Sequence, residues 1–328
     1  MDAPNRGPDG RSPHRPARRR QAAAWVPPAR EGVAASCVAL PPGAWTTVLD
    51  FLAWRLPMVS AEAWRVRLAA GDVVDPDGQP VPADAAYRPS TRLWYWRALA
   101  LEAEVPFEAE ILFQDEHLVV VDKPHFLPMA PKGRYAVHTL LARLTRELGL
   151  RTLSPIHRLD RETAGVVMFS VRPDSRNAYH ALFRERRVSK HYEALAPWRS
   201  ELLWPVERSS RLMPSAHFMQ VHEVDGEPNA LTRIELLGHN GVLGHYRLIP
   251  LTGQTHQLRA HMQALGVPIL GDRIYPILLP ETAPGEPPDY SQPLQLLACA
   301  IAFTDPLSGQ AREFRSRRRL RLDPELPA

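Results

Sequence analysis

The chain of 328 residues has few cysteines, almost no lysine and no long apolar segment. Its two cysteines, Cys37 and Cys299, belong to no Cys-x-x-Cys pair, which excludes a disulfide framework and a thiolate zinc site. The longest apolar run, 294–303, is about half as long as the roughly 20 residues that a membrane-spanning helix needs. No apolar stretch follows the arginine-rich N-terminus, so a secretory signal is not expected. These absences predict a cytoplasmic protein with no membrane partner.

Positive charge comes almost entirely from arginine and is concentrated at the two ends of the chain. Of the 40 basic residues only Lys123, Lys132 and Lys190 are lysines. Residues 1–30 carry a net charge of +5 and residues 310–328 carry +3, so the total of +4 leaves −4 for the body between them. Arginine runs are suited to neutralising RNA phosphates, and they also occur in solvated tails without a partner. Charge alone therefore identifies no partner.

Composition and hydrophobic periodicity divide the chain into four predicted segments. Proline, with 34 residues, occurs at about twice its usual frequency, and the Arg/Pro-rich residues 1–40 are predicted to be a disordered tail. Helical and extended patterns then predict a small α+β module over 41–104. The main domain is expected over 105–315, followed by a basic C-terminal tail over 316–328.

Strand and helix patterns follow one another irregularly in the main domain. The absence of a regular strand–helix–strand rhythm favours an α+β architecture over a doubly wound one. Helices are predicted at 48–56, 60–70, 139–148, 173–187 and 255–265, and strands at 72–74, 92–96, 111–113, 118–122, 166–171, 190–196, 232–236 and 245–250.

A polar cluster at 157–161 directly precedes the apolar strand predicted at 166–171. Arg158 and Arg161 flank Asp160, and a neighbouring positive charge keeps a carboxylate ionised. An ionised carboxylate at the end of a sheet is suited to act as a nucleophile or a general base. The alternative is a loop whose charges form structural ion pairs.

Two further clusters contain polar side chains. Gln257 and His261 share one face of the helix predicted at 255–265, because they are four residues apart. His256 and His261 are five residues apart and lie on different faces, unlike the two histidines of a zinc-binding helix. A metal-dependent hydrolase built on these two histidines is therefore a remote alternative. Tyr192, on a predicted strand, would by itself indicate core packing.

Taken together, these clusters resemble the motifs of the RluA-type pseudouridine synthases. The resemblance covers about residues 108–315, and the occurrence of several motifs in the same order argues against chance. The matching segments are Asp115 to Pro124, His157-Arg158-Leu159-Asp160 with Thr163 and Gly165, Lys190-x-Tyr192-x-Ala194, Thr252-Gly253 with Gln257-Leu258-Arg259-x-His261, and the trailing Gly266 to Asp272.

The resemblance implies a fold and an activity. The expected fold is a pseudouridine synthase catalytic domain, α+β with a mixed, mainly antiparallel central sheet, preceded by a small N-terminal α+β module. Enzymes of this family isomerise uridine in RNA to pseudouridine, and the matching positions make Asp160 the essential carboxylate. Tyr192 would stack on the target base, and Arg259 would pair with Asp160. The 41–104 module loosely resembles a small RNA-binding module that often precedes this domain.

The resemblance also implies the partners of the protein. Its substrate would be ribosomal large-subunit RNA or tRNA, whose target uridine must be flipped out of the stack. No cofactor or metal is implied, and we expect the protein to act as a monomer. A non-catalytic RNA-binding or ribosome-assembly factor on the same fold is the alternative. The residues expected to contact RNA are Arg158, His157, Arg161, Lys190, Gln257 and His261.

Overall fold

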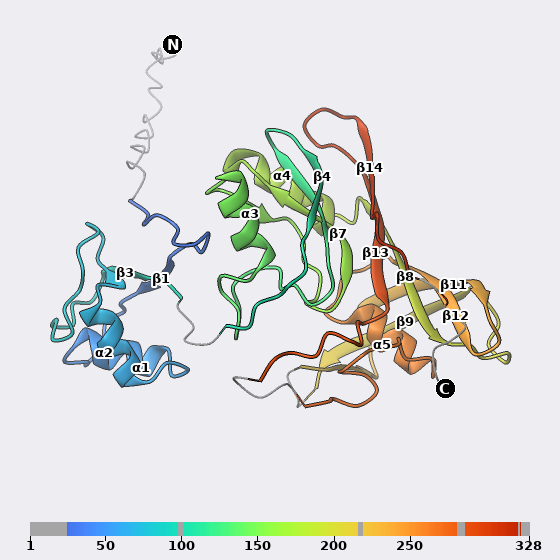
Figure 1. Cartoon of the computed structure of the whole chain (residues 1–328), viewed down its shortest axis with the longest axis horizontal. Helices are drawn as coiled ribbons and strands as arrows, with labels where there is room; N and C mark the ends of the chain where they lie inside the picture. The colour runs from blue at the N-terminus through green and yellow to red at the C-terminus, as the bar shows by residue number, and fades with distance from the viewer. Residues whose placement is uncertain (1–24, 98–101, 216–218, 281–285, 321, 323–328) are drawn as a thin grey trace, which may run out of the picture. The chain divides into compact units, whose positions relative to one another are not determined.

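The computed structural model divides into two compact units. The first contains residues 25–28 and Ser36–Tyr95, and the second contains Ala29–Ala35 and the residues from Trp96 onward. Figure 1 colours the chain from its N-terminus to its C-terminus and labels the main elements. The structure describes residues 25–97, 102–215, 219–280, 286–320 and 322.

The first unit is a three-stranded antiparallel sheet accompanied by two helices, with the strand order β1-β3-β2. Its α+β composition agrees with the module predicted over 41–104, but the unit runs over Ser36–Tyr95 and so begins and ends earlier. Its elements are β1 (Ser36–Ala39), α1 (Val48–Arg55), α2 (Ala61–Ala69), β2 (Val73–Val74) and β3 (Arg92–Tyr95).

Local sequence signals start both helices of this unit. Thr47 and Asp50 form a capping box at the start of α1, in which the Thr47 hydroxyl accepts from the Asp50 amide at 3.1 Å. The hydroxyl of Ser60 caps α2 in the same way. The apolar faces of the helices meet around Phe51 and Trp64, which are fully buried. The structure thus contains both helices that the sequence predicted for this segment.

The N-terminal segment is ordered in the described part of the range in which a disordered tail was predicted, residues 25–40. Residues 1–24 of the predicted tail 1–40 lie outside the described residues. In the part that is described, Ser36–Ala39 form β1, and Val33 is buried against Ala142 of the second unit. The prediction is wrong for this part because the ordering contacts come from residues distant in sequence, which no local pattern reveals.

The second unit is built on one sheet of eleven strands, in the order β10-β9-β11-β12-β8-β13-β7-β5-β4, with β14 on β13 and β6 on β7. Among the described strands of this sheet, only β13 and β7 pair in parallel, with Leu297 opposite Ala164 and Ala298 opposite Gly165. The strands are β4 (Glu110–Gln114), β5 (Leu118–Lys123), β6 (Ser154–Pro155), β7 (Ala164–Ser170), β8 (Val188–Pro197), β9 (Val206–Pro214), β10 (Val221–Val224), β11 (Ala230–His239), β12 (Leu243–Pro250), β13 (Leu296–Thr304) and β14 (Ala311–Arg315).

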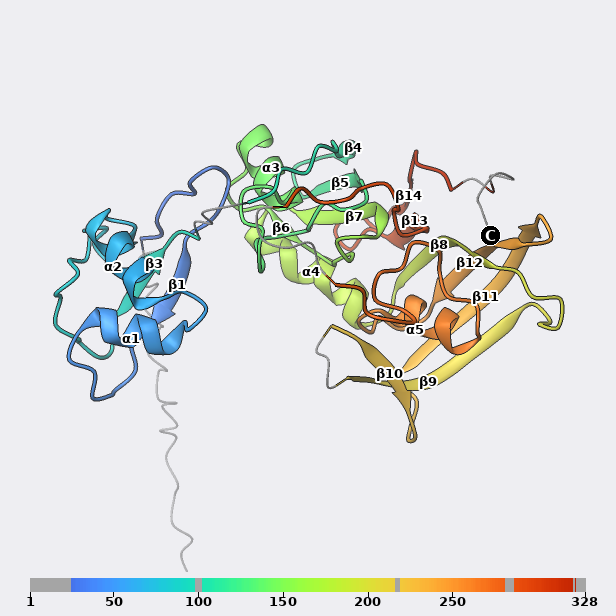
Figure 2. The same ribbon diagram turned by 60° about the horizontal axis from the view of Figure 1, so that its bottom comes forward.

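Helices pack on this sheet and explain the apolar run in β5. Val119 and Val121 pack with residues of α3, whereas Leu118 and Val120 pack with residues of α4. Because successive side chains of a strand point to opposite faces, a strand covered on both faces is apolar at every position. Figure 2 shows α5 beside β10, β11 and β12. The helices are α3 (Leu140–Leu148), α4 (Pro173–Arg184) and α5 (Gln257–Ala264).

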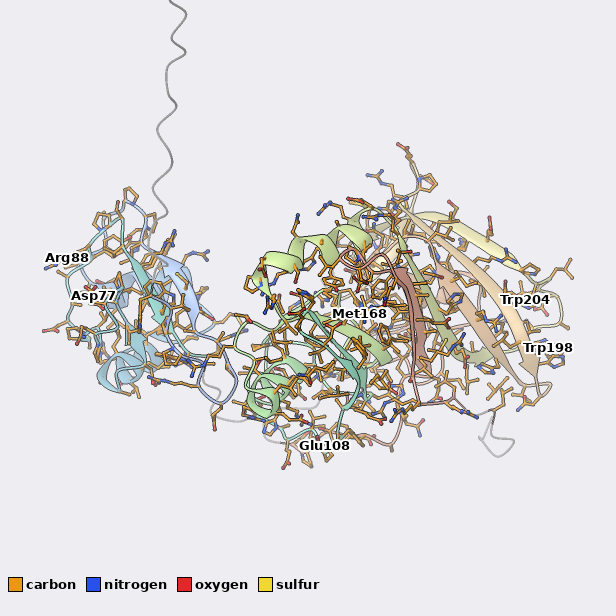
Figure 3. All side chains as sticks on the ribbon, turned by 90° about the horizontal axis from the view of Figure 1, so that it is seen from above. Asp77, Arg88, Glu108, Met168, Trp198 and Trp204 are labelled. Atoms are coloured by element: carbon orange, nitrogen blue, oxygen red, sulfur yellow. The ribbon has the colours of Figure 1, made fainter. Side chains whose placement is uncertain are left out.

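Aromatic contacts stabilise one end of the sheet, where the loop after β8 meets β11 and β12. Figure 3 places Met168 inside the unit and Trp198 and Trp204 at the far end of the sheet. The indole of Trp198 stacks on His239 with ring centroids 4.0 Å apart, and the ring of Trp204 lies 4.9 Å from that of Tyr246. These contacts tie the loop after β8 to β11 and β12.

The segment predicted as a basic tail over 316–328 is bound to the sheet where it begins. Ser316 donates to both carboxylate oxygens of the buried Asp122, at 2.8 and 2.9 Å, and the Arg317 amide donates to the same carboxylate at 2.8 Å. The Arg318 guanidinium lies 3.5 Å from it, and Arg317 also pairs with an acidic side chain of β4. These arginines are therefore partly neutralised within the protein. The last residues of the predicted tail lie outside the described part.

The α+β class with a mixed, mainly antiparallel sheet is confirmed. The sequence missed β1, β6, β9, β10, β13 and β14. No helix in the described ranges is both long enough and apolar enough to cross a bilayer.

We predict that Gly165→Ala will strongly destabilise the second unit. Gly165 has a φ of +112°, and a Cβ at this position would lie 2.2 Å from the carbonyl oxygen of Ala298, where β7 and β13 pair. Neither backbone can move without breaking the parallel pairing, so the free energy of unfolding should fall by about 3 kcal/mol or more. Urea unfolding followed by circular dichroism measures this loss.

The matched control is Gly238→Ala on β11. No atom lies within 4 Å of a Cβ built at Gly238, so this variant should unfold close to the wild-type midpoint. Equal stability of the two variants would contradict the close approach of β7 and β13.

Candidate active site

A cavity of about 490 Å³ opens where three distant segments of the chain meet. The walls are the loop 156–163 before β7, the strand β8, and the loop 251–256 before α5. The predicted catalytic residues Asp160, Tyr192 and Arg259 all line it, although 99 positions separate the first from the last. Other lining residues include His157, Arg158, Phe183, Arg186, Lys190, Thr252, Gln254 and His256.

The loop that carries Asp160 is held in place by a buried lysine. Lys123, at the end of β5, donates three hydrogen bonds to backbone carbonyls, including that of Arg161 at 3.0 Å. His125 donates to the carbonyl of Glu162 at 2.7 Å. Burial lowers the pKa of Lys123 to about 7, against the opposing effect of the Glu162 and Asp160 charges. The backbone next to Asp160 is thus fixed by groups that reach it from another strand.

Arg259 is almost completely buried and contacts two carboxylates. It forms a two-point ion pair with Asp272, with Nε 2.8 Å from Oδ2 and Nη2 2.6 Å from Oδ1. Its Nη1 lies 3.4 Å from Asp160 Oδ2, so the contact that the resemblance implied is present but is the looser of the two. Burial alone would lower the pKa of Arg259, but the hydrogen bonds and charge of Asp272 raise it. Asp272 is therefore the main partner, a role that the sequence did not assign.

Tyr192 forms part of the cavity wall from β8. Its side chain packs with both large clusters of apolar residues in this unit. Burial, followed by the negative charge of Asp160, raises the pKa of Tyr192 well above the usual range of a phenol. Tyr192 is therefore a neutral aromatic side chain beside the carboxylate, which suits stacking on a base.

His256 is a site residue that sequence reasoning considered only as a remote metal ligand. It immediately precedes α5 and has a left-handed backbone, with φ of 52° and ψ of 17°. Its Nε2 lies 3.6 Å from Asp160 Oδ2, and its Nδ1 lies 3.4 Å from the hydroxyl of Tyr275. The signal in the sequence was its place in the first turn of the helix predicted at 255–265, beside a site motif, but a single histidine there is not informative.

Four of the six residues expected to contact RNA line the cavity: His157, Arg158, Lys190 and Gln257. Arg158 is exposed at its edge. Lys190 donates to the carbonyl of Thr252 at 2.9 Å, and burial, with a smaller contribution from the charge of Arg186, lowers its pKa to about 8. His157 accepts from a backbone amide of β7 at 3.2 Å, and burial lowers its pKa to about 3, so it is neutral. Only Arg158 and Lys190 bring positive charge to the cavity from this set.

Two of the residues expected to contact RNA, His261 and Gln257, use their side-chain polar groups within the protein. Both ring nitrogens of His261 contact hydroxyls, those of Thr232 and Ser210, and the side chain has no exposed surface. The amide of Gln257 makes four hydrogen bonds that join the loop before α5 to β11. These two residues share a helix face, as predicted, but that face packs on the sheet.

Arg161 points to a different cavity from Asp160. Its guanidinium pairs with the Glu162 carboxylate at 2.6 Å and lines a second cavity of about 600 Å³. The reason is local: consecutive residues of an extended loop direct their side chains to opposite sides. The arginines flanking Asp160 therefore do not act together on it.

A metal site on His256 and His261 has no geometric support. His261 uses both ring nitrogens within the protein, as described above, whereas His256 faces Asp160. Within the described ranges, no group of three or more His, Cys, Asp or Glu side chains is arranged to hold a metal ion.

Comparisons with known proteins agree with this geometry. Residues 117–264 match the model of the family described as RNA pseudouridylate synthase. The chain is 32% identical over 207 residues to the dual-specificity RNA pseudouridine synthase RluA of Pasteurella multocida, covering 61% of this chain and 88% of that protein. The chain belongs to the RluA-type family of RNA pseudouridine synthases.

Two further comparisons cover part of the chain or support the fold. Human pseudouridylate synthase RPUSD2 is 38% identical over 180 residues, which is 52% of this chain and 32% of that protein. The match thus spans about a third of the human relative. The solved structure of human RNA Pseudouridylate Synthase Domain Containing 1 superposes with a TM-score of 0.51 at 23% identity, covering 66% of this chain and 86% of that one. It supports the fold.

Membership of the RluA-type family confirms the predicted family and enzyme class. The roles assigned to Asp160, Tyr192 and Arg259 remain predictions, now with a geometry that tests can address. So do the RNA contacts of the residues at the edge of the cavity.

We predict that Asp272→Asn will impair both stability and catalysis. The side chains of Arg259 and Asp272 are 2% and 0% exposed, so the variant leaves a buried cation without its main counter-charge. Loss of one partner of a buried pair costs about 3 kcal/mol or more. Urea unfolding measures the loss, and conversion of uridine in RNA is measured at a temperature where the variant is folded.

Glu223→Gln is the matched control for this variant. Glu223 pairs with Arg208, but both side chains are partly exposed, at 23% and 34%, so its loss should cost about 1 kcal/mol or less. Equal stability of the two variants would show that the buried Arg259–Asp272 pair contributes no more to the free energy of unfolding than a partly exposed pair.

We predict that RNA binding by this pseudouridine synthase weakens as the pH rises through about 8, the pKa of Lys190. Lys190 is cationic below that pH and neutral above it, so one phosphate-neutralising charge is lost. The slope of log Kd against log salt should decrease by about one between pH 7 and pH 9. Fluorescence anisotropy with labelled RNA measures the slope.

Lys190→Arg is the control for the pH effect, since arginine stays charged throughout this range. The variant should retain the full slope at pH 9. If wild type and variant change equally with pH, the effect does not come from Lys190.

Proposed function

We propose that this protein isomerises uridine to pseudouridine in ribosomal RNA or tRNA, with Asp160 as the essential carboxylate. The observation that carries the proposal is the placement of Asp160 at the cavity, with Oδ2 3.4 Å from the buried Arg259 and Tyr192 in the adjoining wall. The cavity, about 490 Å³, is within the size range of ligand sites and suits a flipped nucleotide.

The geometry supports a division of roles among these residues. The Asp160 carboxylate contacts His256 and Arg259 through Oδ2, whereas among the described residues Oδ1 has no polar partner and is available to act on the ribose. Arg259 holds the carboxylate and is itself fixed by Asp272. Tyr192 provides an aromatic surface for the uracil. The reaction is an isomerisation, so its atoms and electrons balance without an external oxidant or reductant.

We propose the RNA target from the names of related proteins. A mitochondrial protein of Saccharomyces cerevisiae named tRNA pseudouridine(32) synthase is 32% identical over 172 residues, covering 51% of this chain and 37% of that protein. The Pasteurella multocida relative is named as having dual specificity. These names support tRNA as one candidate substrate. A cytoplasmic location, a monomeric state and RNA binding by the N-terminal unit stay predictions.

Asp160→Asn should abolish conversion without abolishing RNA binding. The change keeps the size of the side chain and removes its charge, so the rate should fall by about 10³-fold or more while Kd changes little. Pseudouridine formed in bulk RNA is quantified by mass spectrometry of nucleosides, and binding is measured by filter retention. Asp225→Asn, on an exposed turn, is the matched control and should convert RNA at the wild-type rate.

Retention of activity by Asp160→Asn would overturn the assignment of this carboxylate. A different set of results would support the non-catalytic RNA-binding factor. The wild-type protein would bind RNA but form no pseudouridine, and cells carrying Asp160→Asn in its place would grow normally.

A further inference from the structure

The backbone of His256 has a conformation that is uncommon for a residue other than glycine. Its φ of 52° lies in the left-handed region, where residues with side chains are found mostly at turns and functional sites. It occupies the N-cap position of α5, but its side chain makes no capping hydrogen bond to that helix. The fold therefore does not use this side chain to stabilise the helix, and instead directs it into the cavity.

The hydrogen bonds around Tyr275 indicate which nitrogen of His256 carries the proton. The Tyr275 hydroxyl accepts from the Val221 amide at 2.8 Å and donates to the Val221 carbonyl at 3.1 Å. With its only proton used in this way, the hydroxyl can only accept from His256 Nδ1, which lies 3.4 Å away. The other nitrogen, Nε2, then has a free lone pair directed toward Asp160.

The isomerisation requires a base late in the reaction. The N1–C1′ bond of uridine breaks and a C1′–C5 bond forms, after which C5 carries both the ribose and its original hydrogen. C5 then gives up this hydrogen as a proton, the bonding electrons return to the ring, and N1 gains a proton. The base that accepts this proton must therefore be a side chain of the cavity that has a free lone pair and lies near the Asp160 carboxylate.

Few side chains of the cavity meet this requirement. Arg158 and Arg259 have no lone pair available for a proton. Tyr192 is a buried, neutral phenol, as described above, and a neutral phenol is a poor base. The Asp160 carboxylate is paired with Arg259 through Oδ2, and a carboxylate is ordinarily a weaker base than a neutral imidazole. The remaining candidate next to Asp160 is the imidazole of His256.

We propose that His256 is a catalytic residue that accepts the C5 proton on Nε2 after the new carbon–carbon bond has formed. This inference rests on the proposed isomerisation of uridine. Asp160, with Oδ2 3.6 Å from Nε2, stabilises the imidazolium that results. Tyr275 orients the ring through Nδ1 and is a positioning residue.

The charges around His256 suit a base that is neutral before the reaction. Burial lowers the pKa of His256, as do the nearby cations Arg259 and Arg158, whereas Asp160 and Asp272 raise it. The net shift is downward, so the imidazole is uncharged at neutral pH and can accept a proton.

The test compares wild type with His256→Asn on a pool of tRNA and ribosomal RNA transcribed with UTP or with UTP deuterated at C5. Asparagine tolerates the left-handed backbone and removes the base. Single-turnover conversion should slow by about 10²-fold, and the deuterium isotope effect at C5 should become larger than in wild type because proton removal has become limiting. His256→Gln serves as a second variant, and its isotope effect should rise in the same way. His222→Asn, an exposed histidine on β10, should match wild type in both readouts.

Three outcomes would overturn the inference, and they are distinguishable. An unchanged rate in both His256 variants would show that the imidazole is dispensable. A slower rate with an unchanged isotope effect would show that His256 only positions Asp160. If wild type forms no pseudouridine in the pool while it binds the RNA, the proposed function fails and the inference fails with it.

Tyr275→Phe should slow conversion less than His256→Asn, consistent with its positioning role.

Discussion

The buried ion pair between Arg259 and Asp272 is the contact on which the active site depends. The carboxylate of Asp272 also accepts from the amides of Ile274 and Tyr275, at 2.8 and 3.0 Å, so it fixes the loop after α5 as well as the guanidinium. Tyr275 in turn contacts His256, and Arg259 contacts Asp160. Two charges buried together thus orient the side chains around the cavity, an arrangement that is stable only while both partners are present.

The elements that could be predicted were those with local signals. The helix α3 begins at Thr139, whose hydroxyl caps it, and ends at Gly149 in the left-handed conformation. Such signals depend on neighbours in sequence and survive in any fold. The strand β9 has only one buried residue, Leu212, among polar and half-exposed neighbours, so its sequence has no strand pattern. Its place in the sheet comes from pairing with β11, which sequence alone does not reveal.

The site could be predicted in its motifs but not in the direction of its side chains. Asp160, Tyr192 and Arg259 do meet at one cavity, as the resemblance implied. Gln257 and His261 lie in the same motif, yet their helix face turns inward, because the rotation of α5 is set by packing on β11 and β12. Asp272 stood at the end of a matching motif, but its pairing with Arg259 could be seen only after folding.

The central prediction is that this chain forms pseudouridine in RNA and that Asp160 is required. The most direct measurement is a pseudouridine map of total RNA from cells that have the wild-type gene, the Asp160→Asn gene or no gene. We expect at least one modified position that is present with the wild type and absent in both other strains. An identical map in all three strains would contradict it.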